Sequence, residues 1–170
     1  MAWAAFGVPE NYGTTISRER RLEPQHVEAV TQIARRMREE FPKARHILVG
    51  HSNGGITAAL QSALDKPPFD GIVFSAPNIS AFPLRWEPTH AKVPIKFIVH
   101  ANDNCVSGPR RNSINTDTIN MAGRRFPLTV IRSRSAGEYS ECFSAPAPHF
   151  FTNNYVEYAD AILQWAASLK

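Results

Sequence analysis

The chain has 170 residues, a formal net charge of +4 and 43% hydrophobic residues. This length suits one domain with a substantial core, so we expect residues 1–170 to form a single domain. The basic residues are scattered, and no continuous stripe of them alternates with aromatic residues, which argues against nucleic-acid binding. No apolar stretch reaches the length of a membrane span.

The first third of the chain predicts a short strand and then a long helix. Residues 2–8 are apolar and predict a strand, whereas residues 9–23 are polar and irregular. A helical period begins at Pro24 and ends at Pro42. The apolar face of this helix is expected to consist of Val27, Val30, Ile33, Ala34, Met37 and Phe41.

The rest of the chain alternates between strand and helix patterns. Apolar runs predict strands at 46–50, 71–75, 93–99 and 128–131, and helical patterns are expected from 54 to about 64, at about 113–123 and at 152–169. The last helix is expected to pack through Tyr155, Ala159, Ile162, Leu163, Ala166 and Leu169. Such alternation indicates an α/β fold, a three-layer α/β/α arrangement around a mostly parallel sheet. Binding and catalytic sites in these sheets form beyond the carboxyl ends of the strands.

The most informative segment is Gly50-His51-Ser52-Asn53-Gly54, which lies between a predicted strand and a predicted helix. Strand, Gly-x-Ser-x-Gly and helix is the layout of a nucleophile elbow, in which glycine two residues before and after the serine avoids a clash. The alternative is a glycine-rich turn that binds nothing or cradles a phosphate. No lysine follows as in a P-loop, and the glycine spacing differs from that of a dinucleotide loop.

Two further residues fall at the same edge of the predicted sheet. Asp103 lies in the loop after strand 93–99, and His149 lies between the last strand and the last helix. A serine nucleophile needs a base to take its proton and an acid to orient that base. Asp117, in a predicted helix, is the weaker candidate for the acid. His100 is expected to pack or hydrogen-bond near the site.

With the order Ser52, Asp103, His149, each after the expected strand, the chain resembles the α/β-hydrolase superfamily of serine esterases and lipases. The resemblance implies that Ser52 attacks an acyl carbonyl, that His149 moves the proton and that Asp103 orients His149. It also implies that the backbone N–H of Asn53 binds the oxyanion. The expected substrate is a small-molecule ester or related acyl compound. No cofactor is implied, and no spacing of cysteine and histidine indicates a metal site.

The two cysteines flank the proposed acid and base. The segment from His100 to Cys105, and Cys142 ahead of Pro148-His149-Phe150, resemble one branch of secreted or periplasmic bacterial hydrolases. If Asp103 and His149 meet, their loops are neighbours, and a disulfide between Cys105 and Cys142 becomes feasible. Two reduced thiols in a cytoplasmic protein are the alternative. The chain starts without an export signal, so a periplasmic or secreted location is expected only for a full-length parent.

Compared with the α/β-hydrolase fold that it resembles, the chain lacks a pattern for the first strands. We find no segment in residues 1–23 that supplies the second oxyanion donor, which normally follows an earlier strand. The chain is therefore expected to correspond to the C-terminal two-thirds of the fold, with an exposed sheet edge that favours homo-oligomers. Under the alternative hypothesis, the chain is a non-catalytic relative that binds a small molecule or assembles with itself. Phe82 and Trp86, in loop 76–92, are expected either in the core or in a substrate pocket.

Overall fold

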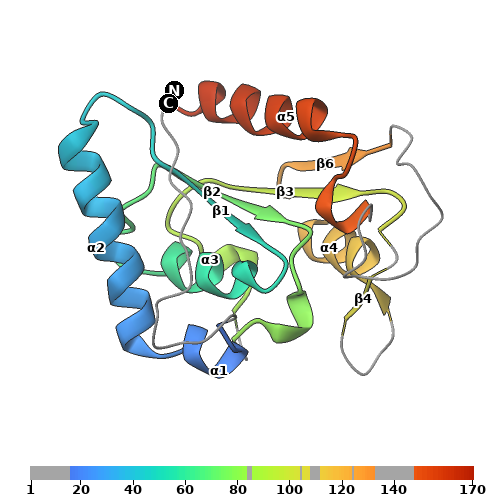
Figure 1. Ribbon diagram of the computed structural model, residues 1–170, viewed down its shortest axis with the longest axis horizontal. Helices are drawn as coiled ribbons and strands as arrows, with labels where there is room; N and C mark the ends of the chain where they lie inside the picture. The colour runs from blue at the N-terminus through green and yellow to red at the C-terminus, as the bar shows by residue number, and fades with distance from the viewer. Residues whose placement is uncertain (1–15, 84–85, 104, 108–111, 124, 133–147) are drawn as a thin grey trace.

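The computed structural model describes residues 16–83, 86–103, 105–107, 112–123, 125–132 and 148–170 (Figure 1). Its α-helices are α1 (Arg18–Arg21), α2 (Pro24–Glu40), α3 (Gly54–Ser62), α4 (Ile114–Ala122) and α5 (Tyr155–Ser168). Its strands are β1 (Ile47–His51), β2 (Gly71–Ser75), β3 (Ile95–His100), β4 (Val106–Ser107), β5 (Asn112–Ser113) and β6 (Leu128–Ile131). The described residues also form the short 3₁₀ turns η2 (Ile79–Ala81), η3 (Pro88–His90) and η4 (Pro148–Phe150).

The main sheet has four parallel strands in the order β1-β2-β3-β6. Each of these strands lies within two residues of its predicted range, because each is mostly apolar, and β2 is buried along its whole length. The strands β4 and β5 make a separate antiparallel pair. Parallel order and intervening helices confirm the predicted α/β fold. The strand expected at residues 2–8 lies outside the described residues.

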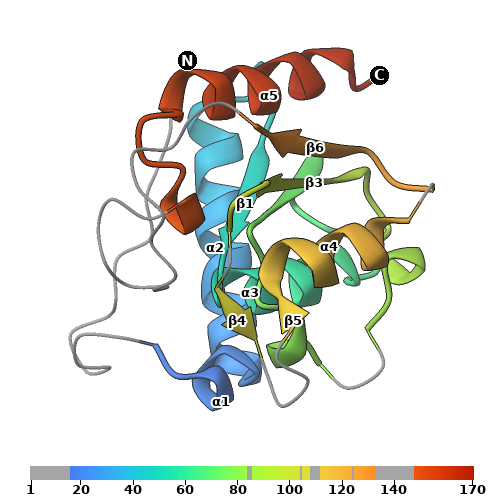
Figure 2. The ribbon, with the colours of Figure 1, turned by 90° about the vertical axis from the view of Figure 1, so that its right-hand side faces the viewer.

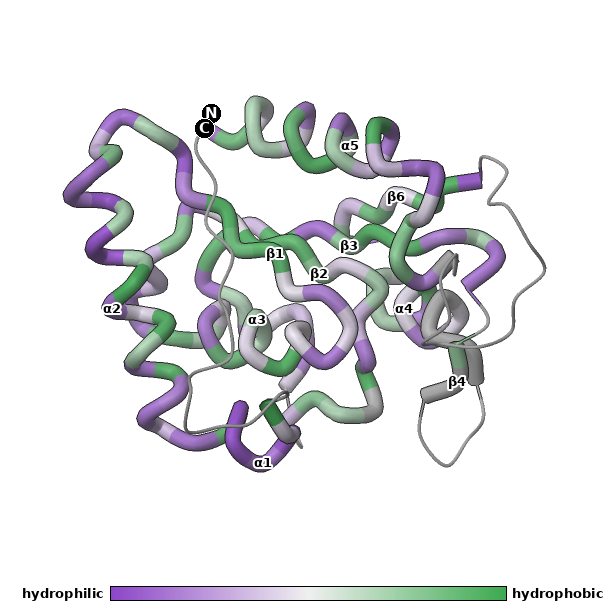
Figure 3. The backbone as a smooth tube through the Cα atoms, viewed as in Figure 1, coloured by the Kyte–Doolittle hydropathy of each residue, from purple (hydrophilic) through white to green (hydrophobic). Residues whose placement is uncertain are grey.

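Helices cover both faces of this sheet. Helix α5 lies on one face, and α2, α3 and α4 lie on the other (Figure 2). The tube in Figure 3 is hydrophobic along the strands that these helices enclose, whereas α2 alternates between hydrophobic and hydrophilic residues. The described helices include none that combines the length and the apolar character needed to cross a membrane.

An aromatic cluster fills the core beneath α3. The ring of Phe74 lies 5.1 Å from the ring of Phe97 and 5.1 Å from that of Trp86, centroid to centroid. Phe82 joins the cluster at 5.6 Å from Phe74. All four side chains are buried. Phe82 and Trp86 are therefore core residues, which settles the choice left open by the sequence.

Two predicted helix faces were partly wrong. Ile33 in α2 and Phe41 at its C-cap are 42% and 38% exposed. The buried residues of α2 form the narrower stripe of Val30, Thr31 and Ala34. In α5, Tyr155 and Leu163 are 61% and 38% exposed, and Ala159 is exposed too. The residues of α5 and its C-cap that face the sheet and its core are Tyr158, Ala161, Ile162, Trp165 and Leu169. The buried indole of Trp165 sets the rotation of α5, which the apolar period alone did not indicate.

Candidate active site

The segment around Ser52 is a tight turn between β1 and α3. Ser52 has a φ of 50°, in the left-handed region that residues with a side chain rarely adopt. Its backbone N–H donates to the carbonyl of Ser75 at 3.0 Å, and its carbonyl accepts from Gly55 N at 3.0 Å and from Asn78 N at 3.1 Å. Both backbone polar groups of Ser52 are thus fixed by β2, α3 and the loop after β2.

The glycines of the motif differ in whether the surrounding structure leaves room for a Cβ atom. A Cβ on Gly50 would lie 2.6 Å from Ala58 Cβ and 2.6 Å from the carbonyl oxygen of Gly54. A Cβ on Gly54 would meet nothing within 4 Å, so the prediction that Gly54 avoids a clash was wrong. The close approach occurs one residue later, where a Cβ on Gly55 would lie 2.8 Å from the ring of Phe82. Gly50 and Gly55 are therefore the positions where the turn excludes a side chain.

Backbone strain gathers around this turn and around His149. Among the described residues other than glycine, Ser52, Ala76, Phe151 and Asn153 have positive φ angles of 50°, 39°, 54° and 68°. Ala76 directly follows β2, and the last two lie between η4 and α5. Strained backbone of this kind concentrates at functional sites, because the surrounding structure must hold it in place.

Asp103 and His149 form a buried hydrogen-bonded pair. His149 Nδ1 lies 2.9 Å from Asp103 Oδ2, and the two side chains are 2% and 1% exposed. The second carboxylate oxygen of Asp103 accepts the backbone N–H of Cys105 at 3.0 Å. Asp103 follows β3 and His149 lies in η4, so residues 46 positions apart meet at the carboxyl edge of the sheet. Such a carboxylate can orient an imidazole and stabilise its protonated form.

The other acid and histidine weighed from the sequence occupy different places. Asp117 lies in the first turn of α4, and the carboxylate that His149 contacts is that of Asp103. His100 is fully buried, with Nδ1 accepting from Asn102 N at 3.1 Å and Nε2 3.1 Å from the side-chain amide of Asn154. Its hydrogen bonding near the site agrees with the prediction.

Ser52 and His149 are linked through a neighbouring residue and not by a direct hydrogen bond. No hydrogen bond joins their side chains in the described part of the chain, although such bonds are often long without substrate. The contact is made by His51, whose ring lies 4.9 Å from the ring of His149. The residue before Ser52 therefore packs on the imidazole that Asp103 holds.

Asn53 stands at the N-terminus of α3, where it is the N-cap residue. Its side-chain oxygen accepts from Asn78 Nδ2 at 2.9 Å. Its backbone N–H enters none of the hydrogen bonds found among the described residues. A free N–H at a helix N-terminus favours a partial negative charge nearby.

Sequence reasoning missed three residues that meet beside the site. His51 Nδ1 is 3.1 Å from Ser75 Oγ, and the hydroxyl of Tyr158 donates to Ser75 Oγ at 2.9 Å. Burial, together with the charge of His149, lowers the pKa of His51 to about 4, and burial raises the pKa of Tyr158. The histidine beside Ser52 was the signal in the sequence, whereas its partners depend on strand register and on the rotation of α5.

One group of side chains has the chemistry of metal ligands. The donor atoms of Asp103, Cys105 and His149 lie within 4.8 Å of one another. However, the carboxylate of Asp103 and the imidazole of His149 are hydrogen-bonded to each other. Two of the three donors are thus already engaged. Cys142 lies outside the described residues, so its bond with Cys105 remains a prediction.

Comparison with known families agrees with this geometry. A family model described as Hydrolase_4, serine aminopeptidase S33, matches residues 21–116, more than half of the chain. The matched range includes Ser52 and Asp103. No curated protein and no solved structure matches the chain. With its parallel sheet and this match, the chain belongs to the serine aminopeptidase S33 family of α/β-hydrolases.

Proposed function

We propose that the protein is a serine hydrolase that cleaves a carboxylic ester or a related acyl compound. Ser52 Oγ attacks the acyl carbonyl while His149 takes its proton. His149 then returns this proton to the leaving group, and water releases the acyl group from Ser52 in a second round. Asp103 orients the imidazole and stabilises its charged form. No cofactor takes part in these steps.

The observation that carries the proposal is the buried pair of Asp103 and His149. A carboxylate held 2.9 Å from an imidazole, with both side chains at most 2% exposed, costs solvation free energy that a surface pair would not. The pair lies at the carboxyl edge of the sheet, where Ser52 is held in a strained turn. A buried ionisable pair and a strained serine both lower the stability of the fold. Both features are typical of catalytic sites, so their presence at one edge of the sheet supports acyl transfer.

The backbone N–H of Asn53 is the proposed oxyanion donor. It lies next to Ser52 and at the N-terminus of α3. Negative charge that develops on the carbonyl oxygen would be stabilised there by the N–H and by the helix dipole. Loss of one such donor costs about 10²- to 10³-fold in turnover in other hydrolases.

The family description names an aminopeptidase, so an amide is a second acyl substrate class to test beside esters. Both classes share the acyl-enzyme on Ser52 and differ in the leaving group. We expect the activated ester p-nitrophenyl acetate to react faster than an aminoacyl p-nitroanilide, since an alkoxide or phenolate leaves more easily than an amine.

The test is labelling of the 170-residue chain with a fluorophosphonate probe, together with hydrolysis of p-nitrophenyl acetate. Ser52→Ala is expected to abolish labelling and to lower turnover by at least about 10³-fold. Ser168→Ala, at the far end of α5, is the control that should keep both. A wild-type chain that neither labels nor turns over would support the non-catalytic binding or self-assembling domain instead.

A disulfide between Cys105 and Cys142 belongs to the same proposal. Cys105 is 8% exposed, and its backbone N–H contacts the carboxylate of Asp103. A covalent link at this point would hold the loop that carries Asp103. Such a bond would also place the protein in an oxidising compartment, either the periplasm or the exterior.

A further inference from the structure

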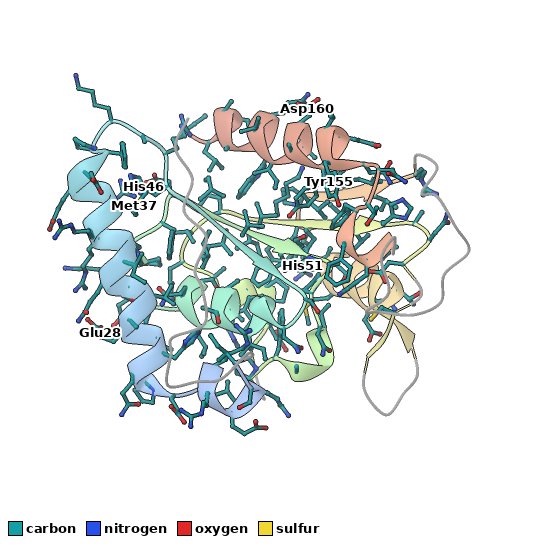
Figure 4. The ribbon with its side chains drawn as sticks, viewed as in Figure 1. Glu28, Met37, His46, His51, Tyr155 and Asp160 are labelled. Atoms are coloured by element: carbon teal, nitrogen blue, oxygen red, sulfur yellow. The ribbon has the colours of Figure 1, made fainter. Side chains whose placement is uncertain are left out.

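His51 connects Ser52 and His149, because it precedes Ser52 in the chain and its ring contacts the ring of His149. It is the last residue of β1 and precedes Ser52, and its side chain reaches the segment that carries the proposed base. The ring of His51 is 4.9 Å from the ring of His149, tilted by 46°, and 5.4 Å from the ring of Phe150. Figure 4 labels His51 at the carboxyl end of its strand and His46 at the opposite end.

The ring of His51 is anchored from two other elements. Ser75 is its register partner on β2, and Ser75 Oγ is 3.1 Å from His51 Nδ1. The hydroxyl of Tyr158 on α5 reaches the same Oγ at 2.9 Å. Ser75 is fully buried, so this chain of polar contacts is shielded from water. The orientation of His51 is thus fixed by the sheet and by α5 together.

The other ring nitrogen indicates that stability alone does not explain this histidine. Nε2 of His51 is buried and has no hydrogen-bond partner among the residues that the structure describes. An unsatisfied buried nitrogen carries a desolvation penalty, which a phenyl ring of similar size would avoid. The ring also remains uncharged at neutral pH, because its pKa is about 4. The benefit of a histidine here therefore lies in its anchored contact with His149.

The imidazole of His149 needs such a contact. Among the described residues its ring makes one hydrogen bond, to Asp103, so the groups packed against the ring set its tilt about that bond. These groups include the rings of His51 and Phe150. The backbone nearby is irregular, since His149 lies in the three-residue turn η4 and Phe151 has a φ of 54°. The anchored ring of His51 is the neighbour that comes from a strand and not from this irregular turn, so it can limit the tilt of the imidazole. Rigid support of this kind sets how well a catalytic group is aligned.

We propose that His51 is a positioning residue, which fixes the tilt of the His149 imidazole through its anchor on Ser75 and Tyr158. This inference rests on the proposed hydrolase function. It adds residues from β2 and α5 to a site that the chain order alone assigns to Ser52, Asp103 and His149. The role predicts an effect on turnover rather than on substrate binding.

Three variants of the 170-residue chain separate the ring from its anchor. His51→Asn keeps a polar atom near Ser75 and removes the ring, His51→Phe keeps a ring and removes the anchor, and Ser75→Ala removes the anchor while His51 stays. His46→Asn, the same substitution just before β1, is the matched control. The measurements are kcat and KM on p-nitrophenyl acetate, and the NMR signal of the His149 Nδ1–H proton at pH 7. Circular dichroism establishes that each variant is folded.

We expect His51→Asn to lower kcat by about 10- to 100-fold with KM within about threefold, and to broaden or shift the His149 proton signal. His51→Phe and Ser75→Ala should lie between His51→Asn and the wild type, and His46→Asn should match the wild type. A His51→Asn variant with kcat within about twofold of the wild type and an unchanged signal would overturn the proposal.

The NMR signal keeps this inference separate from the proposed function. If the wild type fails to label and to turn over, the hydrolase proposal fails on its own. The His149 proton then still decides the positioning role: a change in His51→Asn and Ser75→Ala, absent in His46→Asn, supports it. An unchanged signal in all three variants refutes it.

Discussion

Replacement of Gly50 by alanine tests the geometry of the turn that presents Ser52. The added Cβ would lie 2.6 Å from Ala58 Cβ and 2.6 Å from the Gly54 carbonyl oxygen, with the Gly54 carbonyl carbon at 3.0 Å. Neither neighbour is the flexible end of a long side chain. One is a methyl group on α3 and the other is backbone, so relief of the clash requires α3 to move away from β1.

The expected cost lies at the upper end of the range for overpacked cores, at about 3 kcal/mol. A domain of this kind has a free energy of unfolding of about 5–15 kcal/mol, so this loss is a large fraction of it. With a urea m-value of about 2 kcal/mol/M, the unfolding midpoint should fall by about 1.5 M. The shift of α3 would also displace Ser52 and Asn53, so turnover should fall together with stability.

Gly54→Ala is the matched control from the same motif. A Cβ there meets nothing within 4 Å, and Gly54 is the first residue of α3. Alanine should therefore leave the free energy of unfolding unchanged or raise it by about 0.4–1 kcal/mol, because it restricts the unfolded chain. The double variant Gly50→Ala/Ala58→Gly removes only the methyl contact, so it should recover part of the loss and leave the clash with the Gly54 carbonyl.

The assay is equilibrium urea unfolding followed by tryptophan fluorescence and circular dichroism. The reasoning is refuted if Gly50→Ala and Gly54→Ala have the same midpoint within error. It is also refuted if Ala58→Gly restores the full stability of Gly50→Ala, since the backbone contact would then carry no cost.

Further predictions concern the acid, the cysteines and pH. Asp103→Asn should lower kcat by about 10⁴-fold without unfolding the chain, whereas Asp117→Asn should leave kcat unchanged; the reverse result would reassign the acid. Non-reducing peptide mapping should find Cys105 bonded to Cys142 after oxidative refolding, and reduction should cost about 3 kcal/mol in urea unfolding; two free thiols would contradict this. The pKa of His51 falls from 6.5 to about 4 on folding, so the unfolded chain binds more protons between these pH values. Stability should therefore fall by about 1–3 kcal/mol as pH drops from 6.5 to 4, and this component should vanish in His51→Phe; parallel pH curves for the two proteins would exclude it.

The sequence predicted the four strands of the main sheet because each one is mostly apolar. Strands β2 and β6 have the bounds that the sequence predicts, β1 is displaced by one residue, and β3 begins two residues later and ends one residue later than predicted. The sequence did not predict α1, nor the pair β4 and β5, which has two residues in each strand. Elements this short contain too few residues for any period to emerge. The expected self-association through a sheet edge remains a prediction.

The sequence likewise predicts one part of the candidate site and not the other. The meeting of Asp103 and His149 could be expected, because each residue follows a parallel strand and the carboxyl ends of such strands share one edge. The contact of His51 with Ser75 and Tyr158 could not. It requires the register that pairs His51 with Ser75, and a rotation of α5 that turns Tyr158 toward the sheet. The register depends on how β1 pairs with β2, and the rotation of α5 goes with the burial of Trp165; no local pattern reveals either.

The positive φ angles around the site have a consequence for how this protein can evolve. Glycine would relieve each of these positions, and asparagine tolerates the left-handed region, yet only Asn153 is of either type. Ser52, Ala76 and Phe151 each cost about 1–3 kcal/mol, together a sum comparable to the stability of a whole domain. At residue 151 the buried ring, which stacks on Tyr158 at 4.4 Å, outweighs this relief, because its loss would cost about 3–5 kcal/mol. At residue 76 glycine would remove only a methyl group, so selection for stability would accept it and selection for a rigid site would oppose it. The amino acid at this position in related chains therefore records which of the two pressures has prevailed.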